Sequence, residues 1–179
     1  MNSTSIISSI QDSIRKNWDL EALTDYKGTT LLYRDIARRI AKLHILFQAA
    51  GIKPGDKIAL CGRNCANWAS ACLAAMSYGA VIVPILHEFK PNNIHNIVNH
   101  SDAKILFAGD HIWENLNESM MPELTGIIII DDFSLAISRD ENLTEAREHL
   151  NELFGKKYPK DFTPSNVCYA VPPSDSLAM

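Results

Sequence analysis

The sequence lacks the features that would place it in a membrane, outside the cell or on nucleic acid. No segment approaches the ~20 consecutive apolar residues that a membrane-spanning helix requires. Residues 1–18 have no basic start, continuous apolar stretch or cleavage site of a secretory leader. The net charge is −4, and the one basic run, residues 34–42, has its charges spread around a predicted helix. We therefore expect a cytoplasmic protein with no transmembrane segment and no nucleic-acid partner.

Cysteine is scarce, and its spacing does not suggest a metal or redox site. The four cysteines are Cys61, Cys65, Cys72 and Cys168. Without a secretory route, free thiols in a reducing cytoplasm are expected rather than disulfides. Cys61 and Cys65 lack the C-x-x-C spacing of zinc and redox motifs, so buried thiols are the favoured interpretation.

Glycine-rich phosphate loops are also missing. No Gly-x-Gly-x-x-Gly follows a predicted strand, and Gly51 and Gly55 lack the spacing and the Lys-Ser/Thr of a P-loop. The segment 127–132 resembles the apolar strand with terminal acids that holds magnesium in P-loop nucleotidases. Because the partner loop is absent, we interpret Asp131 and Asp132 as an acidic turn after a strand.

Two histidines do not have the spacing of a zinc site on a helix. His95 and His100 are five residues apart, whereas two zinc ligands on one helix face are four apart with a glutamate between them. The sequence therefore predicts no metal ligand here.

What the sequence does contain is an alternation of helical and strand-like segments. Hydrophobic residues make up 46% of the chain and charged residues 21%, a balance typical of globular domains. Helices are expected at residues 6–18, 33–50, 65–78, 91–98, 111–124 and 142–157. Short apolar strands are expected at residues 57–61, 81–86, 104–108 and 126–131, and a hairpin at residues 22–32.

Apolar strands that alternate with helices favour parallel pairing with right-handed crossovers. The predicted fold class is α/β, a doubly wound and mainly parallel sheet with flanking helices, formed by a partial domain. Residues 1–20 are assigned to an N-terminal amphipathic helix, residues 21–158 to the α/β subdomain, and residues 159–179 to an irregular connection with a short extended piece at 167–171.

One polar pair follows the predicted strand 81–86. His87 and Glu88 stand at its carboxyl end, where open α/β sheets bind ligands. An acid–base pair and a solvated loop are both compatible with this position.

Four segments together resemble a known family. They are Leu31-Leu32-Tyr33-Arg34-Asp35-Ile36, the run from Gly51 to Leu60 (Gly-Ile-Lys-Pro-Gly-Asp-Lys-Ile-Ala-Leu), Asn64-Cys65-Ala66-Asn67-Trp68, and the run from Gly79 to Ile85 (Gly-Ala-Val-Ile-Val-Pro-Ile). In this order and spacing they are similar to the opening motifs of the adenylate-forming, AMP-binding enzymes. The resemblance covers residues 24–179, and the long-chain fatty acid–CoA ligase branch is the most similar.

The resemblance implies an activity for a longer parent enzyme. Such enzymes use ATP and Mg²⁺ to convert a carboxylic acid to an acyl-adenylate, which coenzyme A then turns into a thioester. Residues 175–179 are similar to the run just before the family's phosphate-binding loop. That loop, the magnesium motif and the catalytic lysine have no counterpart here, so no catalytic, cofactor-binding or metal residue is assigned. The implied unit is an N-terminal piece, inactive alone, whose partner is the remainder of the same polypeptide.

Two alternatives stay open. The parent could be another adenylate-forming enzyme, an aryl-CoA ligase or a peptide-synthetase adenylation domain. The chain could instead be a short non-catalytic interaction module that self-associates through exposed apolar surface.

One motif also has a direct physical meaning. The family pattern Thr/Ser-x-x-Glu is a capping box at a helix start. Here Leu32 replaces the capping hydroxyl and Asp35 replaces the glutamate. We expect a helix that begins at Tyr33 with an impaired cap.

Overall fold

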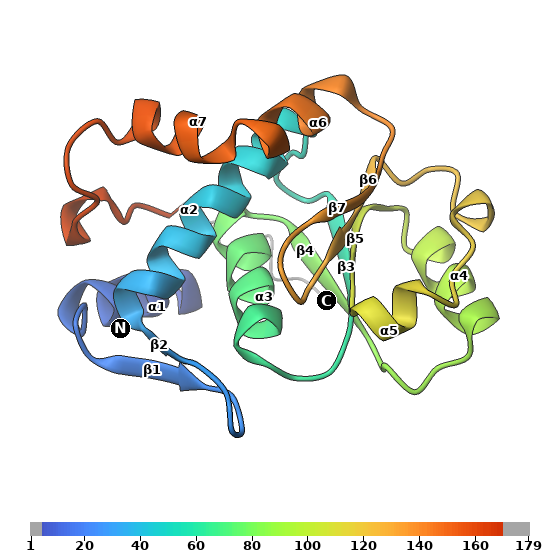
Figure 1. Ribbon diagram of the computed structural model, residues 1–179, viewed down its shortest axis with the longest axis horizontal. Coiled ribbons are helices and arrows are strands. Elements are labelled where there is room, and N and C mark those ends of the chain that lie inside the picture. The colour runs from blue at the N-terminus through green and yellow to red at the C-terminus, as the bar shows by residue number, and fades with distance from the viewer. Residues whose placement is uncertain (1–4, 170–179) are drawn as a thin grey trace.

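The computed structural model describes residues 5–169 as an α/β layer preceded by a helix and a hairpin (Figure 1). The α-helices are α1 (Ile6–Lys16), α2 (Tyr33–Ala49), α3 (Ala66–Tyr78), α4 (Pro91–His100), α5 (Asp110–Trp113), α6 (Glu141–Glu148) and α7 (Leu150–Lys157), with 3₁₀ turns η1 (Glu118–Met120) and η2 (Pro164–Asn166). The strands are β1 (Glu21–Thr24), β2 (Thr30–Leu32), β3 (Lys57–Cys61), β4 (Val81–Ile85), β5 (Ala103–Ala108), β6 (Gly126–Ile129) and β7 (Leu135–Ser138). Among the described residues, no helix combines the length and apolar character needed to cross a bilayer.

The main sheet confirms the predicted fold class. Its strand order is β4-β3-β5-β6-β7, and β3 pairs in parallel with both β4 and β5. β5 and β6 are also parallel, whereas β6 and β7 are antiparallel. The chain first steps from β3 outward to β4 and then returns to the other side of β3 to form β5. This reversal is the signature of a doubly wound sheet.

The two faces of the sheet bury separate clusters of side chains. Along β3, Ile58 and Leu60 belong to one cluster and Ala59 and Cys61 to the other. This alternation follows from the two-residue period of a strand. Helices α2 and α3 cover the first face, and α4 covers the second.

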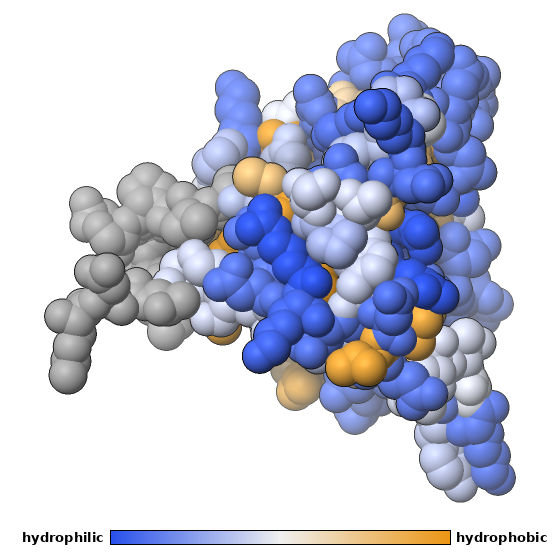
Figure 2. All heavy atoms as spheres, turned by 90° about the vertical axis from the view of Figure 1, so that its left-hand side faces the viewer, coloured by the Kyte–Doolittle hydropathy of each residue, from blue (hydrophilic) through white to orange (hydrophobic). Residues whose placement is uncertain are grey.

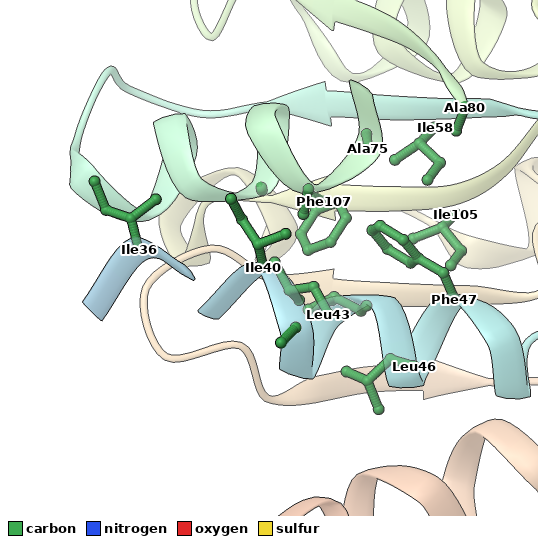
Figure 3. Close-up of a cluster of buried hydrophobic side chains, with 14 of the residues drawn as sticks. Ile36, Ile40, Leu43, Leu46, Phe47, Ile58, Ala75, Ala80, Ile105 and Phe107 are labelled. Atoms are coloured by element: carbon green, nitrogen blue, oxygen red, sulfur yellow. The ribbon is translucent and has the colours of Figure 1, made fainter. Parts of the chain in front are cut away.

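The larger cluster is centred on α2 (Figure 3). Ile40, Leu43 and Phe47 of this helix are at most 2% exposed. Figure 3 shows them directed toward the side chains of the sheet, where the Phe47 and Phe107 rings meet edge to face with centroids 6.1 Å apart. These side chains form the buried apolar face of α2.

The predicted helix over residues 111–124 is wrong. The chain forms only the short helix α5, an irregular stretch and the turn η1. Asn117 accepts the N–H of Ser119 through its side chain, which competes with helical bonding. Arg139 donates to the carbonyl oxygens of Glu118, Met121 and Leu124, and so holds the segment in a non-helical path.

Three smaller differences lie near the C-terminal end. Strand β7 was not predicted, and it adds an antiparallel edge beside β6. The single helix expected over residues 142–157 is divided at His149, whose backbone leaves the helical region at φ −101° and ψ 18°. The extended piece expected at 167–171 lies partly outside the described residues, and residues 167–169 have no regular structure.

Candidate functional site at the carboxyl edge of the sheet

The topology selects one edge of the sheet as the candidate site. The connection after β3 returns on one face and the connection after β5 on the other. The carboxyl ends of these two neighbouring strands therefore form the switch point, outside which open α/β sheets bind ligands. We call this region, with the loops that follow β3, β4, β5 and β6, the carboxyl edge.

Two glycines bring the switch-point backbones together. Gly62 follows β3, Gly109 follows β5, and the N–H of Gly109 donates to the carbonyl oxygen of Cys61 at 2.9 Å. A Cβ on Gly62 would lie 2.5 Å from Cδ1 of Ile130, and a Cβ on Gly109 would lie 3.2 Å from Cε1 of His111. The space beside both glycines is filled by protein atoms. Each of these glycines directly follows a buried strand. This repeated pattern could have been recognised in the sequence, but it was missed.

His87 and Glu88 lie at this edge, as the sequence predicted. Their side chains approach to 3.3 Å, between Nε2 of His87 and Oε1 of Glu88, and the Glu88 side chain is 68% exposed. An ion pair this exposed contributes little energy. The solvated-loop interpretation therefore describes Glu88 better than a catalytic acid–base pair.

The structure brings His87 next to a second histidine that the sequence left unconnected. Both line a pocket of about 270 Å³ between the loop after β4 and α5; its lining residues are His87, Phe89, Pro91, Ile94, His111, Ile112, Asn115 and Leu116. The wall is mainly apolar, with the two imidazoles and one amide as its polar groups. Among residues 5–169 there is no group of three side chains able to hold a metal ion.

The Asn-x-x-x-Trp segment forms a polar junction at the same edge. The side-chain amide of Asn67 donates to the carbonyl oxygens of Ile130 and Asp131, at 2.8 and 2.9 Å. Arg39 of α2 in turn donates to the Asn67 side-chain oxygen. Asn67 therefore fixes the end of β6 to the start of α3, a role that the sequence pattern alone did not reveal.

The two carboxylates after β6 accept hydrogen bonds from nearby backbone N–H groups. Asp131 accepts the N–H of Asp110 at 2.9 Å, which ties the loop after β6 to α5. Asp132 accepts the N–H of Ser134 at 2.8 Å. Hydrogen bonds from Ser134 hold the pKa of Asp132 below its ordinary value. Both carboxylates thus act in an acidic turn, in agreement with our interpretation of the sequence.

The remaining candidate ligands are also engaged in the fold. His95 is buried and its Nε2 accepts the N–H of Asn117 at 3.1 Å, while burial lowers its pKa. His100 is exposed at the end of α4. Cys61 is buried, which raises the pKa of its thiol to about 11. The sulfur of Cys65 accepts the N–H of Trp68 at 3.3 Å and caps α3.

The fold and its motifs can be compared with known proteins. The family model described as AMP-binding enzyme matches residues 10–172. YdaB of Bacillus subtilis, whose name describes it as a candidate acyl-CoA ligase, is 31% identical over 126 residues, or 69% of this chain and 25% of that protein. Surfactin synthase subunit 2 of the same species is 26% identical over 135 residues, or 74% of this chain and 4% of that protein.

Solved structures show the same fold at low identity. Coronafacic acid ligase from Pectobacterium brasiliense has a TM-score of 0.68 and 18% identity, covering 79% of this chain and 29% of that one. The anthranilate CoA ligase AuaEII has a TM-score of 0.66 and 16% identity, covering 72% of this chain and 25% of that one. The chain spans a quarter or less of the length of the curated relatives that it matches.

Proposed function

Because this chain belongs to the family of AMP-binding enzymes, we propose that it forms the N-terminal part of a ligase that joins a carboxylic acid to coenzyme A. The observation that supports this most strongly is the family match over residues 10–172, which includes the four motif segments between Leu31 and Ile85. Those segments build the start of α2, the turn before β3, the start of α3 and strand β4.

The proposed reaction has two steps. The carboxylate of the acid attacks the α-phosphate of ATP, which forms an acyl-adenylate and releases pyrophosphate. The thiol of coenzyme A then attacks the acyl carbon, so that a thioester forms while AMP and a proton leave. The acid class proposed here is a long-chain fatty acid, on the resemblance of the segments 64–68 and 79–84 to that branch.

The contribution of residues 5–169 is to build one wall of the site. A triphosphate needs open backbone N–H groups at a glycine-rich turn. At the carboxyl edge, the side chain of Ile130 fills the space beside Gly62, and the N–H of Gly109 is already bonded to Cys61. These residues do not fit ATP or Mg²⁺, and we assign phosphate binding, metal binding and catalysis to the rest of the polypeptide.

Calorimetry tests this division of roles. We expect no detectable heat of ATP·Mg²⁺ binding to the 179-residue chain. The complete polypeptide, in contrast, should release pyrophosphate from ATP when an acid is added. A stoichiometric ATP isotherm with the short chain would overturn the assignment of phosphate binding, and a complete polypeptide without pyrophosphate release would overturn the ligase.

One observation favours a second candidate function, that of a peptide-synthetase adenylation domain. Surfactin synthase subunit 2 matches 74% of the chain, more than the 69% matched by YdaB. An adenylation domain of that kind would load a carrier protein instead of coenzyme A. A panel of palmitate, octanoate, ferulate and amino acids, each with and without coenzyme A, separates the two. Thioester formation on free coenzyme A with palmitate supports the proposal, whereas adenylation of an amino acid without thioester release supports the rival.

A further inference from the structure

The two ends of the described chain lie against each other. Helix α1 and the residues from Phe162 to Tyr169, here called the C-terminal segment, are adjacent on one side of the molecule (Figure 1). Figure 2 shows this side as mainly hydrophilic, with small and separate hydrophobic areas. The contact joins positions 152 and 158 residues apart in the sequence.

Three side chains near the N-terminus hold the C-terminal segment. The guanidinium of Arg15 donates through Nε and Nη2 to the carbonyl oxygen of Val167, with the Nε distance at 2.9 Å. The side-chain oxygen of Gln11 accepts the N–H of Tyr169 at 2.9 Å. The Trp18 and Phe162 rings lie with centroids 5.9 Å apart.

These contacts are mutual. Among residues 5–169, the hydrogen bonds that link the C-terminal segment to other elements all end on α1. The side-chain hydrogen bonds that leave α1 likewise all end on this segment. Each element therefore supplies the specific polar contacts that orient the other.

The C-terminal segment has three buried residues, Phe162, Val167 and Tyr169. Val167 is 2% exposed and Tyr169 is 9% exposed, while Cys168 between them faces solvent. The Tyr169 ring packs edge-on against His44 of α2, with centroids 6.0 Å apart. Among residues 5–169, no hydrogen-bond partner is present for its buried hydroxyl group, which is an unfavourable arrangement.

The packing of α1 against α2 and α3 is also incomplete. A pocket of about 240 Å³ lies between α1, α2 and α3; its lining residues are Ile6, Ser9, Ile10, Ser13, Ile14, Tyr33, Ile36 and Leu73. Such a gap removes packing contacts that would otherwise hold the helix. α1 buries two side chains, Ile7 and Ile14, whereas α2 buries eight. An element with few buried contacts is one that opens before the rest of a fold.

We propose that α1 is a detachable strap, which holds the C-terminal segment on α2 and α3 and releases it when the helix lifts, while the α/β layer stays folded. The layer does not need the strap, because β3 and β5 are buried by α2, α3 and α4. The position of Tyr169 is then controlled from the opposite end of the chain. This inference does not depend on the proposed ligase activity.

Amide exchange on the 179-residue chain, resolved by NMR, tests the strap. In Arg15→Ala and in Gln11→Ala, we expect exchange at Val167, whose N–H donates within the segment to Pro164 at 3.2 Å, to rise by about tenfold or more while amides of β3 and β5 keep their rates. Lys16→Ala is the matched control, because this exposed neighbour on α1 has no hydrogen bond or ion pair with the segment among residues 5–169.

Two results would overturn the proposal. One is unchanged protection of Val167 in both variants, which would mean that α1 does not hold the segment. The other is faster exchange in β3 and β5 by the same factor, which would mean that α1 is an integral part of the layer. Gln11→Ala removes only a neutral contact, so it keeps the test valid if the arginine variant is poorly folded.

Discussion

His44 is a partly buried titratable residue at the α2–α3 interface. Its Nε2 lies 3.0 Å from the carbonyl oxygen of Ala74 and 3.1 Å from the hydroxyl of Ser77. A neutral ring can donate to Ala74 from Nε2, whereas a charged ring would be poorly solvated. Burial accordingly lowers the pKa of His44 to about 4.

This shift predicts a pH dependence of stability. The unfolded chain binds a proton at His44 near its ordinary pKa of about 6.5, and the folded chain does so only near pH 4. The stability that depends on neutral His44 is therefore complete above about pH 6.5 and is lost as the pH falls toward 4. The loss is on the order of 3 kcal/mol at most.

Urea unfolding between pH 4 and 7 measures this slope. His44→Gln should flatten it, although His95, whose pKa is also lowered, will keep part of the dependence. His149→Gln serves as the control, since its side chain is 55% exposed. An unchanged slope in His44→Gln would contradict the assignment.

The cap of α2 is the second feature that depends on one residue. Leu32 is the N-cap residue and makes no side-chain cap bond, while its own N–H donates to Asp35 at 3.0 Å. Half of the capping box expected from the motif is therefore present.

Leu32→Thr should complete the box and stabilise the protein by about 1 kcal/mol. A thermal melt should then show a midpoint higher by about 2–4 °C. Leu32→Val has a similar β-branched shape without a hydroxyl and should show no such gain. Equal melting temperatures for the threonine variant and the wild type would refute this reading of the motif.

At the scale of elements, helix ends followed their local sequence closely. Gly79 ends α3 at φ +87°, a conformation that disfavours other residues. α4 begins with Pro91 at its first position, where the missing N–H is harmless. The helix expected at 111–124 did not form for the opposite reason: Arg139, which directly follows the strand β7 that the sequence did not reveal, donates hydrogen bonds to carbonyl groups of this segment.

A pair of glycine substitutions separates these helix-end effects from helix propensity. Gly79→Ala should destabilise the domain by roughly 1–2 kcal/mol, because an alanine at positive φ is strained. Gly155→Ala, inside α7 with open space around it, should instead stabilise by roughly 0.5–1 kcal/mol. Urea midpoints of both variants provide the measurement. Changes of the same sign in both would show that the backbone argument is wrong.

At the scale of the whole molecule, one of the two edge strands that the sheet has within residues 5–169 is entirely apolar. This strand is β4, and its five residues are all apolar. The N–H of Val81 donates inward to Asp56, so the alternate residues Ile82 and Pro84 direct their backbone groups outward. Proline offers no N–H there, which leaves Ile82 as the main point for pairing with another strand.

We expect concentration-dependent self-association through this edge, measurable by light scattering. Val81 is 46% exposed, and Val81→Lys should lower the association without changing the melting temperature. Leu20→Lys, at a residue 60% exposed on the side of the hairpin, is the control and should have no effect. A monomer at every concentration, or an equal response to both substitutions, would contradict this expectation.

The sequence by itself determined the features that depend on neighbours along the chain. Gly79 and Pro91 marked helix ends, the runs at residues 57–61 and 104–108 marked buried strands, and their alternation with helices implied the doubly wound sheet. The family motifs were readable for the same reason, since each is a local pattern of helix caps, turns and strand ends.

Only the tertiary structure decided which distant residues meet. Three examples join segments that are far apart in the sequence or lie on different elements. They are the approach of Gly62 to Gly109, the pocket shared by His87 and His111, and the hydrogen bond from Arg15 to Val167. Periodicity reports the face on which a side chain lies but not the partner opposite it. The partners are fixed by strand order and helix packing, which follow from burying both faces of the sheet at once.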